Sequence, residues 1–291
     1  MNRFNKITLA VACVVAGAPA FATPAAIQNG YVLAGVSDYG TLGSDSATSP
    51  GILFDKTGAG NYGVNDFLTP GDPFEGFYVT SSAGSAGANN DGTSGFGFHS
   101  PTALSATSAT WSGSSGAYGI TNTYTLTTVG GRSEIAIHTV LTNTSGSDIT
   151  GLEFLRTLDP DPDVNAFDSY FTNNTVVSNS TACGSGPDSG QTICIDADSS
   201  IAHKAGVSGP SWSQSPAAYL AGQNAGDGDY AIGLAFDIGN LAAGQSVSLD
   251  YDYAAGASIG VVTPSVPEPE NVALMLAGLG LMGIVARRRR G

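Results

Sequence analysis

The sequence predicts an all-β fold, and composition and turn spacing are the observations behind that prediction. Of the 291 residues 40 are glycine, 12% are charged and 42% are hydrophobic. The hydrophobic fraction is enough for a core, whereas so much glycine, serine, threonine and asparagine disfavours long helices. Between residues 23 and 264, turn signals recur every ~8–12 residues and no convincing 3.6-residue period is found. We therefore expect one antiparallel β-sandwich body over 23–264, with two smaller sandwiches as the alternative.

Alternation of apolar and polar residues, together with turn signals, places the individual strands. The predicted strands are 119–129, 134–142, 149–158, 230–237 and 245–253. Gly130-Gly131 predicts a hairpin between the first two. His138 alternates with Ile135 and Ile137, so we expect it on the face away from the core, as a surface side chain rather than a metal ligand or catalytic group.

Two segments rich in small residues are predicted to be loops. They are residues 81–94 and 183–190, which combine glycine, serine and alanine and contain few apolar side chains. Such composition is typical of flexible connections.

The charge distribution excludes nucleic acid as a partner. The chain has a formal net charge of −14, and six of its ten basic residues lie in the two ends. Residues 23–264 hold four basic residues against 22 acidic ones. A body of this charge would be repelled by phosphate backbones.

The first 22 residues have the pattern of a secretory signal peptide. Arg3 and Lys6 precede an apolar stretch over 7–18, and Ala20-Phe21-Ala22 forms a small-x-small cleavage site. This pattern predicts a signal helix, 1–22, that is removed after Ala22 on export. An uncleaved anchor is the weaker interpretation, because the apolar stretch is too short to cross a hydrocarbon core of ~30 Å.

The body then keeps two cysteines, Cys183 and Cys194. In an oxidising, exported setting a pair separated by ten residues predicts one disulfide, since the spacing fits no Cys-x-x-Cys redox or zinc pattern. Closing a loop of this size stabilises the fold by about 2.5–3 kcal/mol in the loop-entropy model. A catalytic thiol is the alternative.

The C-terminal tail, 265–291, has three parts in a fixed order. Pro267, Glu268 and Pro269 come first, an uncharged run over 272–286 follows, and a cluster of four arginines ends the tail. These are Arg287, Arg288, Arg289 and Arg290. As a helix the uncharged run would be about 22 Å long, a short single transmembrane helix, and the arginines would orient it with the body outside the cytoplasm.

This tail resembles the PEP-CTERM sorting signal of Gram-negative bacteria. The resemblance covers only the tail and rests on the Pro-Glu-Pro motif, the short span and the arginine cluster. It implies recognition by an exosortase, an intermediate in the inner membrane, and release or transfer to the cell surface. Proteins with such tails are associated with exopolysaccharide and biofilm. A plain anchor would explain the span and the arginines but not the Pro-Glu-Pro motif.

The densest group of carboxylates is a candidate calcium site. The residues are Asp159, Asp161, Asp163 and Asp168, in a run interrupted by prolines. Carboxylate oxygens at alternate positions suit Ca²⁺, although the spacing is not that of an EF-hand. The alternative is an acidic turn at a strand end, whose aspartates cap local amides. No other cofactor is expected.

Taken together, these patterns predict a non-enzymatic protein of the cell surface or extracellular matrix that meets polysaccharide. A carbohydrate-binding module and a secreted glycan-active enzyme with the same tail are the alternatives. Trp111 and Trp212 could form an aromatic platform for sugars, but such residues more often fill a β core. The enzyme would need a carboxylate pair in a pocket, which the sequence does not reveal.

Overall fold

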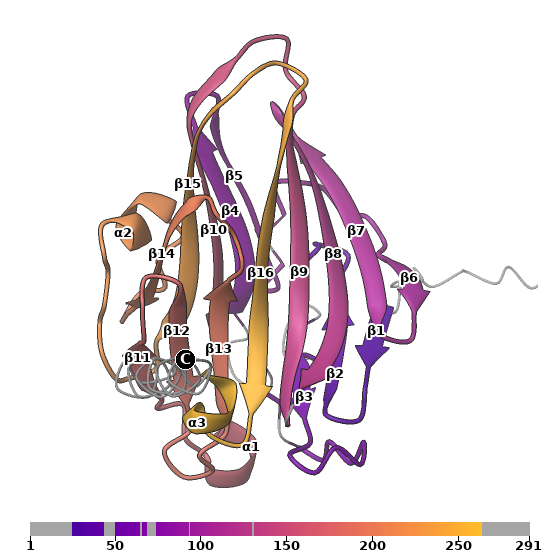
Figure 1. Cartoon of the computed structure of the whole chain (residues 1–291), viewed down its shortest axis with the longest axis vertical. Helices are drawn as coiled ribbons and strands as arrows, with labels where there is room; N and C mark the ends of the chain where they lie inside the picture. Colours follow the sequence, from indigo (N-terminus) through magenta and orange to yellow (C-terminus); the bar gives the residue numbers. More distant parts are fainter. Residues whose placement is uncertain are drawn as a thin grey trace, which may run out of the picture.

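Two large antiparallel sheets face each other across one apolar core, and a small third sheet closes one end (Figure 1). The computed structural model describes residues 25–43, 50–64, 66–68, 74–92, 94–129 and 131–263. Within these residues the protein is all-β, with three short helices. The predicted fold class is confirmed for the body.

The eight-stranded sheet faces the viewer in Figure 1. Its order is β11 (Asn173–Val176), β12 (Thr181–Ser185), β13 (Thr192–Ala197), β16 (Ser246–Gly256), β9 (Arg132–Asn143), β8 (Tyr118–Val129), β7 (Ser108–Ser115) and β6 (Thr102–Ser105). All neighbouring strands are antiparallel, so hairpins rather than crossover helices join most of them.

The five-stranded sheet lies behind it. Its order is β14 (Ala202–Ser208), β15 (Ala231–Leu241), β10 (Ile149–Asp159), β4 (Phe74–Ser81) and β5 (Gly84–Asn89). The small sheet contains β1 (Ala25–Gln28), β2 (Val32–Val36) and β3 (Ile52–Phe54). The helices are α1 (Val164–Phe167), α2 (Pro216–Leu220) and α3 (Ile259–Val262).

All five predicted strands are present, as β8, β9, β10, β15 and β16. The predicted hairpin joins β8 to β9, where Val129 pairs with Arg132. Gly131 has a φ of +86°, in the region that favours glycine. Gly130 lies outside the described residues.

The loop predicted over 81–94 is wrong, and the one over 183–190 holds only for 186–190, the turn between β12 and β13. Residues 84–89 form β5 along the edge of β4, with Ala88 fully buried. Cys183 lies in β12, whose neighbours β11 and β13 pair with it on both sides. Small residues have low strand propensity, but tertiary pairing decides their conformation here.

The core forms from the inner faces of the two large sheets. Ile135 and Ile137 of β9 point inward and are buried. His138, the residue after Ile137, is exposed on the opposite face, as predicted. Phe154 of β10 and Phe236 of β15 approach Tyr251 of β16, with ring centroids 6.0 and 5.9 Å apart. These contacts join the two sheets by aromatic packing.

A fully buried ion pair lies in this core. The Arg156 guanidinium on β10 pairs with the Glu75 carboxylate on β4, and neither side chain is exposed. The Leu42 amide and the Tyr253 hydroxyl donate to Glu75 at 2.7 and 2.9 Å. Arg156 donates to the Tyr124 hydroxyl at 3.3 Å. One charge pair therefore contacts both large sheets and the chain that follows β2.

Breaking this pair should destabilise the fold. Arg156→Met leaves the Glu75 carboxylate buried without its cation, and we expect the free energy of unfolding to fall by about 3–5 kcal/mol in urea titrations. The double variant Arg156→Met/Glu75→Gln buries no charge and keeps an acceptor for Leu42, so it should regain much of the loss. Equal instability of the single and double variants would contradict this account of the pair.

Candidate functional site

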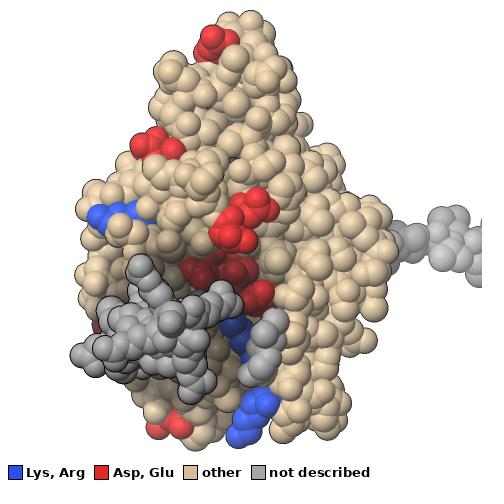
Figure 2. Space-filling view, in the orientation of Figure 1, with Lys and Arg blue, Asp and Glu red and all other residues tan. Residues whose placement is uncertain are grey.

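The outer face of the eight-stranded sheet carries a groove of about 250 Å³ between β8, β9 and β16. We call it the acidic groove. Its ionisable residues are Glu134, His138, Asp198, Asp250 and Asp252. Figure 2 shows acidic side chains gathered in a hollow at the centre of this face. The threonines Thr123 and Thr125 complete its polar wall.

Strand periodicity explains why these residues meet. Glu134 and His138 occupy outward positions on β9, and Asp250 and Asp252 occupy outward positions on β16. The two strands are neighbours, and Asp250 lies directly across from His138. Alternate residues of a strand share one face, so the polar half of each amphipathic strand contributes to a single groove.

His138 and Asp250 form a direct contact, with Nδ1 and Oδ1 2.6 Å apart. Both side chains are about half exposed, at 47% and 53%. The sequence predicted the outer position of His138, but not that Asp250 lies opposite it. An exposed His–Asp pair contributes little to stability. The contact orients the imidazole in the groove.

Arg132, at the start of β9, is surrounded by acids. Its guanidinium lies 2.9 Å from Glu134, 3.3 Å from Asp252 and 3.8 Å from Asp196. It also donates to the Val262 carbonyl at 2.7 Å, which fixes α3 against the sheet. Arg132 thus forms ion pairs with three carboxylates and a hydrogen bond with the last helix of the body.

Asp252 lies in this cluster, and its side chain is only 15% exposed. Burial is the main cause that raises the pKa of Asp252, Arg132 opposes it, and the carboxylates of Glu134 and Asp196 add to it, so that the pKa is about 7. Asp252 therefore gains or loses its proton near neutral pH.

The pKa of Asp252 makes stability depend on pH in a defined direction. An aspartate in an unfolded chain titrates near 3.9, so between about pH 4 and pH 7 the folded protein holds a proton that the unfolded chain releases. The contribution of Asp252 to stability is present at pH 4 and is lost as the pH rises through 7.

Replacing Asp252 by asparagine should remove this loss. At each pH we compare the free energy of unfolding of Asp252→Asn with that of the unmodified protein. We expect this difference, variant minus unmodified, to be larger at pH 8 than at pH 4.5 by on the order of 1–4 kcal/mol. Urea titrations at the two pH values measure the difference, with Asp237→Asn at an exposed position of β15 as the matched control. A difference for Asp252→Asn that is independent of pH would refute the assignment.

A second group of carboxylates lies where β10 ends and β15 begins. One oxygen each from Asp159, Asp161 and Asp229 lies within 4.8 Å of the other two. Asp159 and Asp161 are buried and Asp229 is exposed. We call this group the aspartate cluster, and its donors are of the type that Ca²⁺ prefers.

The aspartate cluster differs in membership from the predicted calcium site. Asp163 lies apart from it and accepts the Asp188 and Ser189 amides at 2.8 and 3.2 Å. Asp168 ends α1 with a φ of +55°. Asp229 was missed, because only the pairing of β15 with β10 brings it to the run at 159–161.

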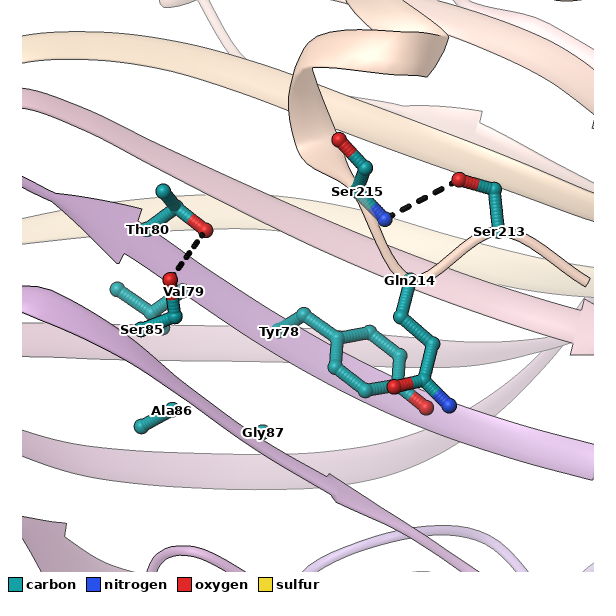
Figure 3. A pocket seen from close by; sticks show the side chains of 9 residues that line it. All are labelled: Tyr78, Val79, Thr80, Ser85, Ala86, Gly87, Ser213, Gln214 and Ser215. Carbon is teal, nitrogen blue, oxygen red and sulfur yellow. Dashed lines mark hydrogen bonds between the residues drawn. The ribbon is translucent and has the colours of Figure 1, made fainter.

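A larger groove, of about 600 Å³, lies on the outer face of the five-stranded sheet (Figure 3). We call it the neutral groove. Nine residues line it: Tyr78, Val79, Thr80, Ser85, Ala86, Gly87, Ser213, Gln214 and Ser215. The first six come from β4 and β5, and the last three from the segment before α2. None of the nine carries a charge.

The two tryptophans do not form a common platform. Trp111 is 1% exposed in the core, and its indole donates to the Asp38 carbonyl at 3.0 Å. Trp212 is partly buried on the outer face of the other sheet, against Phe74 with centroids 5.2 Å apart. Another exposed aromatic side chain, Phe98, packs against Tyr39.

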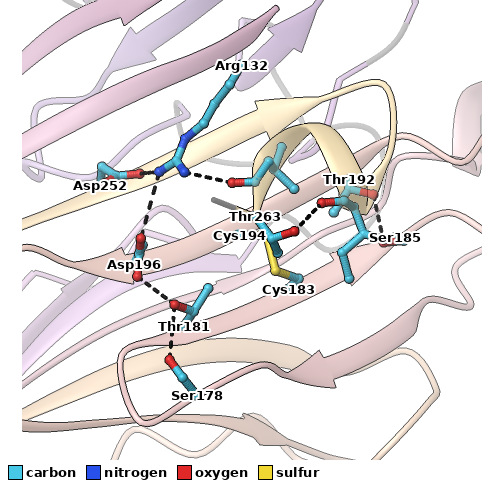
Figure 4. Close-up of a disulfide and its surroundings, with 12 residues drawn as sticks. Arg132, Ser178, Thr181, Cys183, Ser185, Thr192, Cys194, Asp196, Asp252 and Thr263 are labelled. Atoms are coloured by element: carbon cyan, nitrogen blue, oxygen red, sulfur yellow. Dashed lines mark hydrogen bonds and ion pairs between the residues drawn. A yellow bond between two sulfur atoms is a disulfide. The ribbon is translucent and has the colours of Figure 1, made fainter. Parts of the chain in front are cut away.

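The predicted disulfide joins Cys183 of β12 to Cys194 of β13, which are cross-strand partners (Figure 4). Both sulfurs belong to a small buried cluster with Ala254 and Val262. The disulfide and the Arg132 bond therefore hold α3 from two sides, immediately before the tail.

The predicted sorting residues lie outside the described residues, which end at Thr263. This applies to the signal peptide, 1–22, to Pro267, Glu268 and Pro269, to the span over 272–286, and to Arg287, Arg288, Arg289 and Arg290. Among the helices of the described ranges, none has the length and hydropathy needed to cross a membrane.

Comparison with known sequences identifies the tail. Residues 265–290 match the PEP-CTERM protein-sorting motif. The tail is therefore a PEP-CTERM sorting signal, which implies an exported, cell-surface protein sorted by an exosortase. The match ends at the tail and says nothing about the body. No curated protein matches the chain.

Solved structures resemble the body only distantly. A protein of Escherichia coli K12 assigned as an aldose 1-epimerase has a TM-score of 0.47 at 12% identity, covering 80% of this chain and 98% of its own. A polysaccharide lyase gives 0.37 at 13%, covering 82% and 33%. A galactose mutarotase related enzyme of Lactobacillus acidophilus gives 0.33 at 7%, covering 83% and 100%. All three scores are below 0.5, so the likeness assigns neither a fold family nor a function.

Proposed function

We propose that this chain, exported and ending in a PEP-CTERM signal, is a non-enzymatic component of the cell surface or extracellular matrix of a Gram-negative bacterium, where its body meets exopolysaccharide or biofilm. The match of residues 265–290 to the sorting motif is the observation on which the proposal rests. The body is the cargo, and the tail determines where it goes.

Placement proceeds in two steps. The signal peptide, 1–22, directs export and is removed, and the uncharged run over 272–286 then holds the chain in the inner membrane. That run is about 22 Å long as a helix, shorter than a hydrocarbon core of ~30 Å. Arg287 to Arg290 stay on the cytoplasmic side. The exosortase then recognises Pro267-Glu268-Pro269 outside and removes or exchanges the tail.

The structure of the body limits where the exosortase can reach the Pro-Glu-Pro motif. The Arg132 bond to the Val262 carbonyl and the packing of Val262 beside the disulfide fix the chain as far as α3. From Thr263 to Pro267 four residues span at most about 14 Å. The exosortase therefore has to act close to the body, on the side where α3 leaves the sheet.

The Glu268 side chain and the arginine cluster should both be needed for sorting. In Glu268→Gln, or after deletion of Arg287 to Arg290, we expect the protein to remain in the inner membrane with its tail intact, as judged by cell fractionation and immunoblotting. Glu270→Gln, directly after the motif, is the matched control and should leave location unchanged. If Glu268→Gln and the protein without Arg287 to Arg290 were both released normally, exosortase processing would be ruled out.

The aspartate cluster favours calcium as a cofactor of the body. Two buried carboxylates beside a third repel one another, and a divalent cation would offset that repulsion. Asp159, Asp161 and Asp229 would supply three oxygen ligands, which leaves room for carbonyl or water oxygens among the usual 6–8. With a formal charge of −14 on the chain, calcium would also favour contact with acidic glycans.

Calcium should therefore stabilise the folded protein. At a calcium concentration 100 times the Kd, binding would raise the free energy of unfolding by about 2.7 kcal/mol, seen as a higher Tm. We expect Asp161→Asn to abolish the rise and Asp91→Asn, at an exposed position, to retain it. An unchanged Tm, together with no heat in calorimetry, would eliminate the calcium site.

A glycan-active enzyme with the same tail is the rival. It would use the acidic groove, where an imidazole and several carboxylates lie together. Turnover of a polysaccharide that is lost in His138→Gln would favour the rival over the non-enzymatic proposal.

A further inference from the structure

The neutral groove has the size and the shape of a small-molecule site. Its volume of about 600 Å³ falls within the range of ~300–1,000 Å³ typical of ligand pockets. Its uncharged lining contrasts with the body as a whole, in which acids outnumber bases 22 to four. A charged ligand would find no counter-charge among the nine lining residues.

Gly87 and Tyr78 form the floor of the groove. A Cβ at position 87 would lie 2.2 Å from Cδ1 of Tyr78, so only glycine lets the ring lie this close to β5. The ring is held from the other side by a buried cluster that includes Phe74, Leu155 and Tyr219. Tyr78 is 6% exposed, so only a narrow strip of its side chain lines the groove, and the buried remainder holds that strip in place.

Hydroxyl and amide groups form the walls. The hydroxyls of Thr80 and Ser85 lie 3.3 Å apart at one side, and the Ser215 amide donates to the Ser213 hydroxyl at 3.2 Å on the other (Figure 3). Gln214 is exposed, and within the described residues its side-chain amide makes no hydrogen bond. Each of these side chains can both donate and accept.

This combination fits the chemistry of an uncharged sugar ring. A pyranose has an apolar C–H face that would lie on the Tyr78 strip, and hydroxyls that both donate and accept. A purely apolar ligand would bury wall hydroxyls without partners, at a cost of about 1–3 kcal/mol for each. An acidic sugar would add unpaired charge. We propose that the neutral groove binds one uncharged glycosyl unit of an extracellular polysaccharide.

Addition of a peptide strand to the edge of β5 fits the structure less well. The Gly95 amide already donates to the Gly87 carbonyl at 2.7 Å, and Ala88 pairs with Ser94. These contacts occupy the edge beside the groove floor, where an added strand would have to begin. The groove therefore offers side-chain contacts to a ligand more readily than a free strand edge.

Two variants and one control test the glycan site. The probes are dextran, galactomannan and soluble cellulose oligomers, with alginate as the acidic comparison. The full chain is purified in a detergent without a sugar headgroup, and binding is measured by retardation in affinity gels and by calorimetry. In a calcium-free buffer, where no divalent cation can bridge the body to an acidic glycan, we expect retention by at least one neutral glycan and none by alginate.

The variants separate the groove from other surfaces. Ser85→Trp at an exposed position of β5 should fill the groove and abolish retention, and Gln214→Ala should weaken binding roughly 3- to 10-fold. Gln245→Ala, in an exposed turn, is the matched control and should bind normally. Because Gln214→Ala removes only an exposed amide, it tests the site even if Ser85→Trp folds poorly.

The site would be refuted by retention that neither variant changes, or by no retention on any of the neutral glycans. The inference rests on the proposed function only because export brings the body to polysaccharide. Binding is measured on purified protein and sorting by location in the cell, so the two can fail independently.

Discussion

The buried pair of Arg156 and Glu75 is the contact on which the arrangement of the sheets depends. The pair joins β4 to β10, and its other partners come from β8, β16 and the chain after β2, so both large sheets and that chain meet at one pair of charges. A charge in an apolar core is tolerated only where its partners are in place. The pair therefore favours the one relative placement of the sheets in which every donor finds its acceptor.

Once the sheets are placed, their outer faces acquire different chemistry. The eight-stranded sheet gathers carboxylates around Arg132 and His138, and one of these acids, Asp252, titrates near neutral pH. The five-stranded sheet instead presents an uncharged groove over Tyr78. The last helix is fixed beside the acidic face, by Arg132 and the disulfide, so the described part of the chain ends on that side.

The sequence predicted the features that depend on local pattern. The amphipathic strands β8, β9 and β16 were found because apolar residues recur at every second position, and β10 and β15 because apolar segments follow turn signals. It failed where pairing between distant segments decides. Asp229 joins Asp159 only through the pairing of β15 with β10, and nothing local indicates that Arg156 and Glu75 are buried. The small residues of β5 were predicted as a loop for another reason, their low strand propensity, although β5 pairs with the adjacent strand β4. The tail could be identified from the sequence because its motif is one contiguous segment and does not depend on folding.

The central claim is that the tail is a detachable address and the β body is what remains outside the cell. The intact mass of the protein collected from outside the cells tests this most directly. The account predicts a mass that lacks both the first 22 residues and the arginine cluster at 287–290. A mass that still includes the four arginines would contradict it.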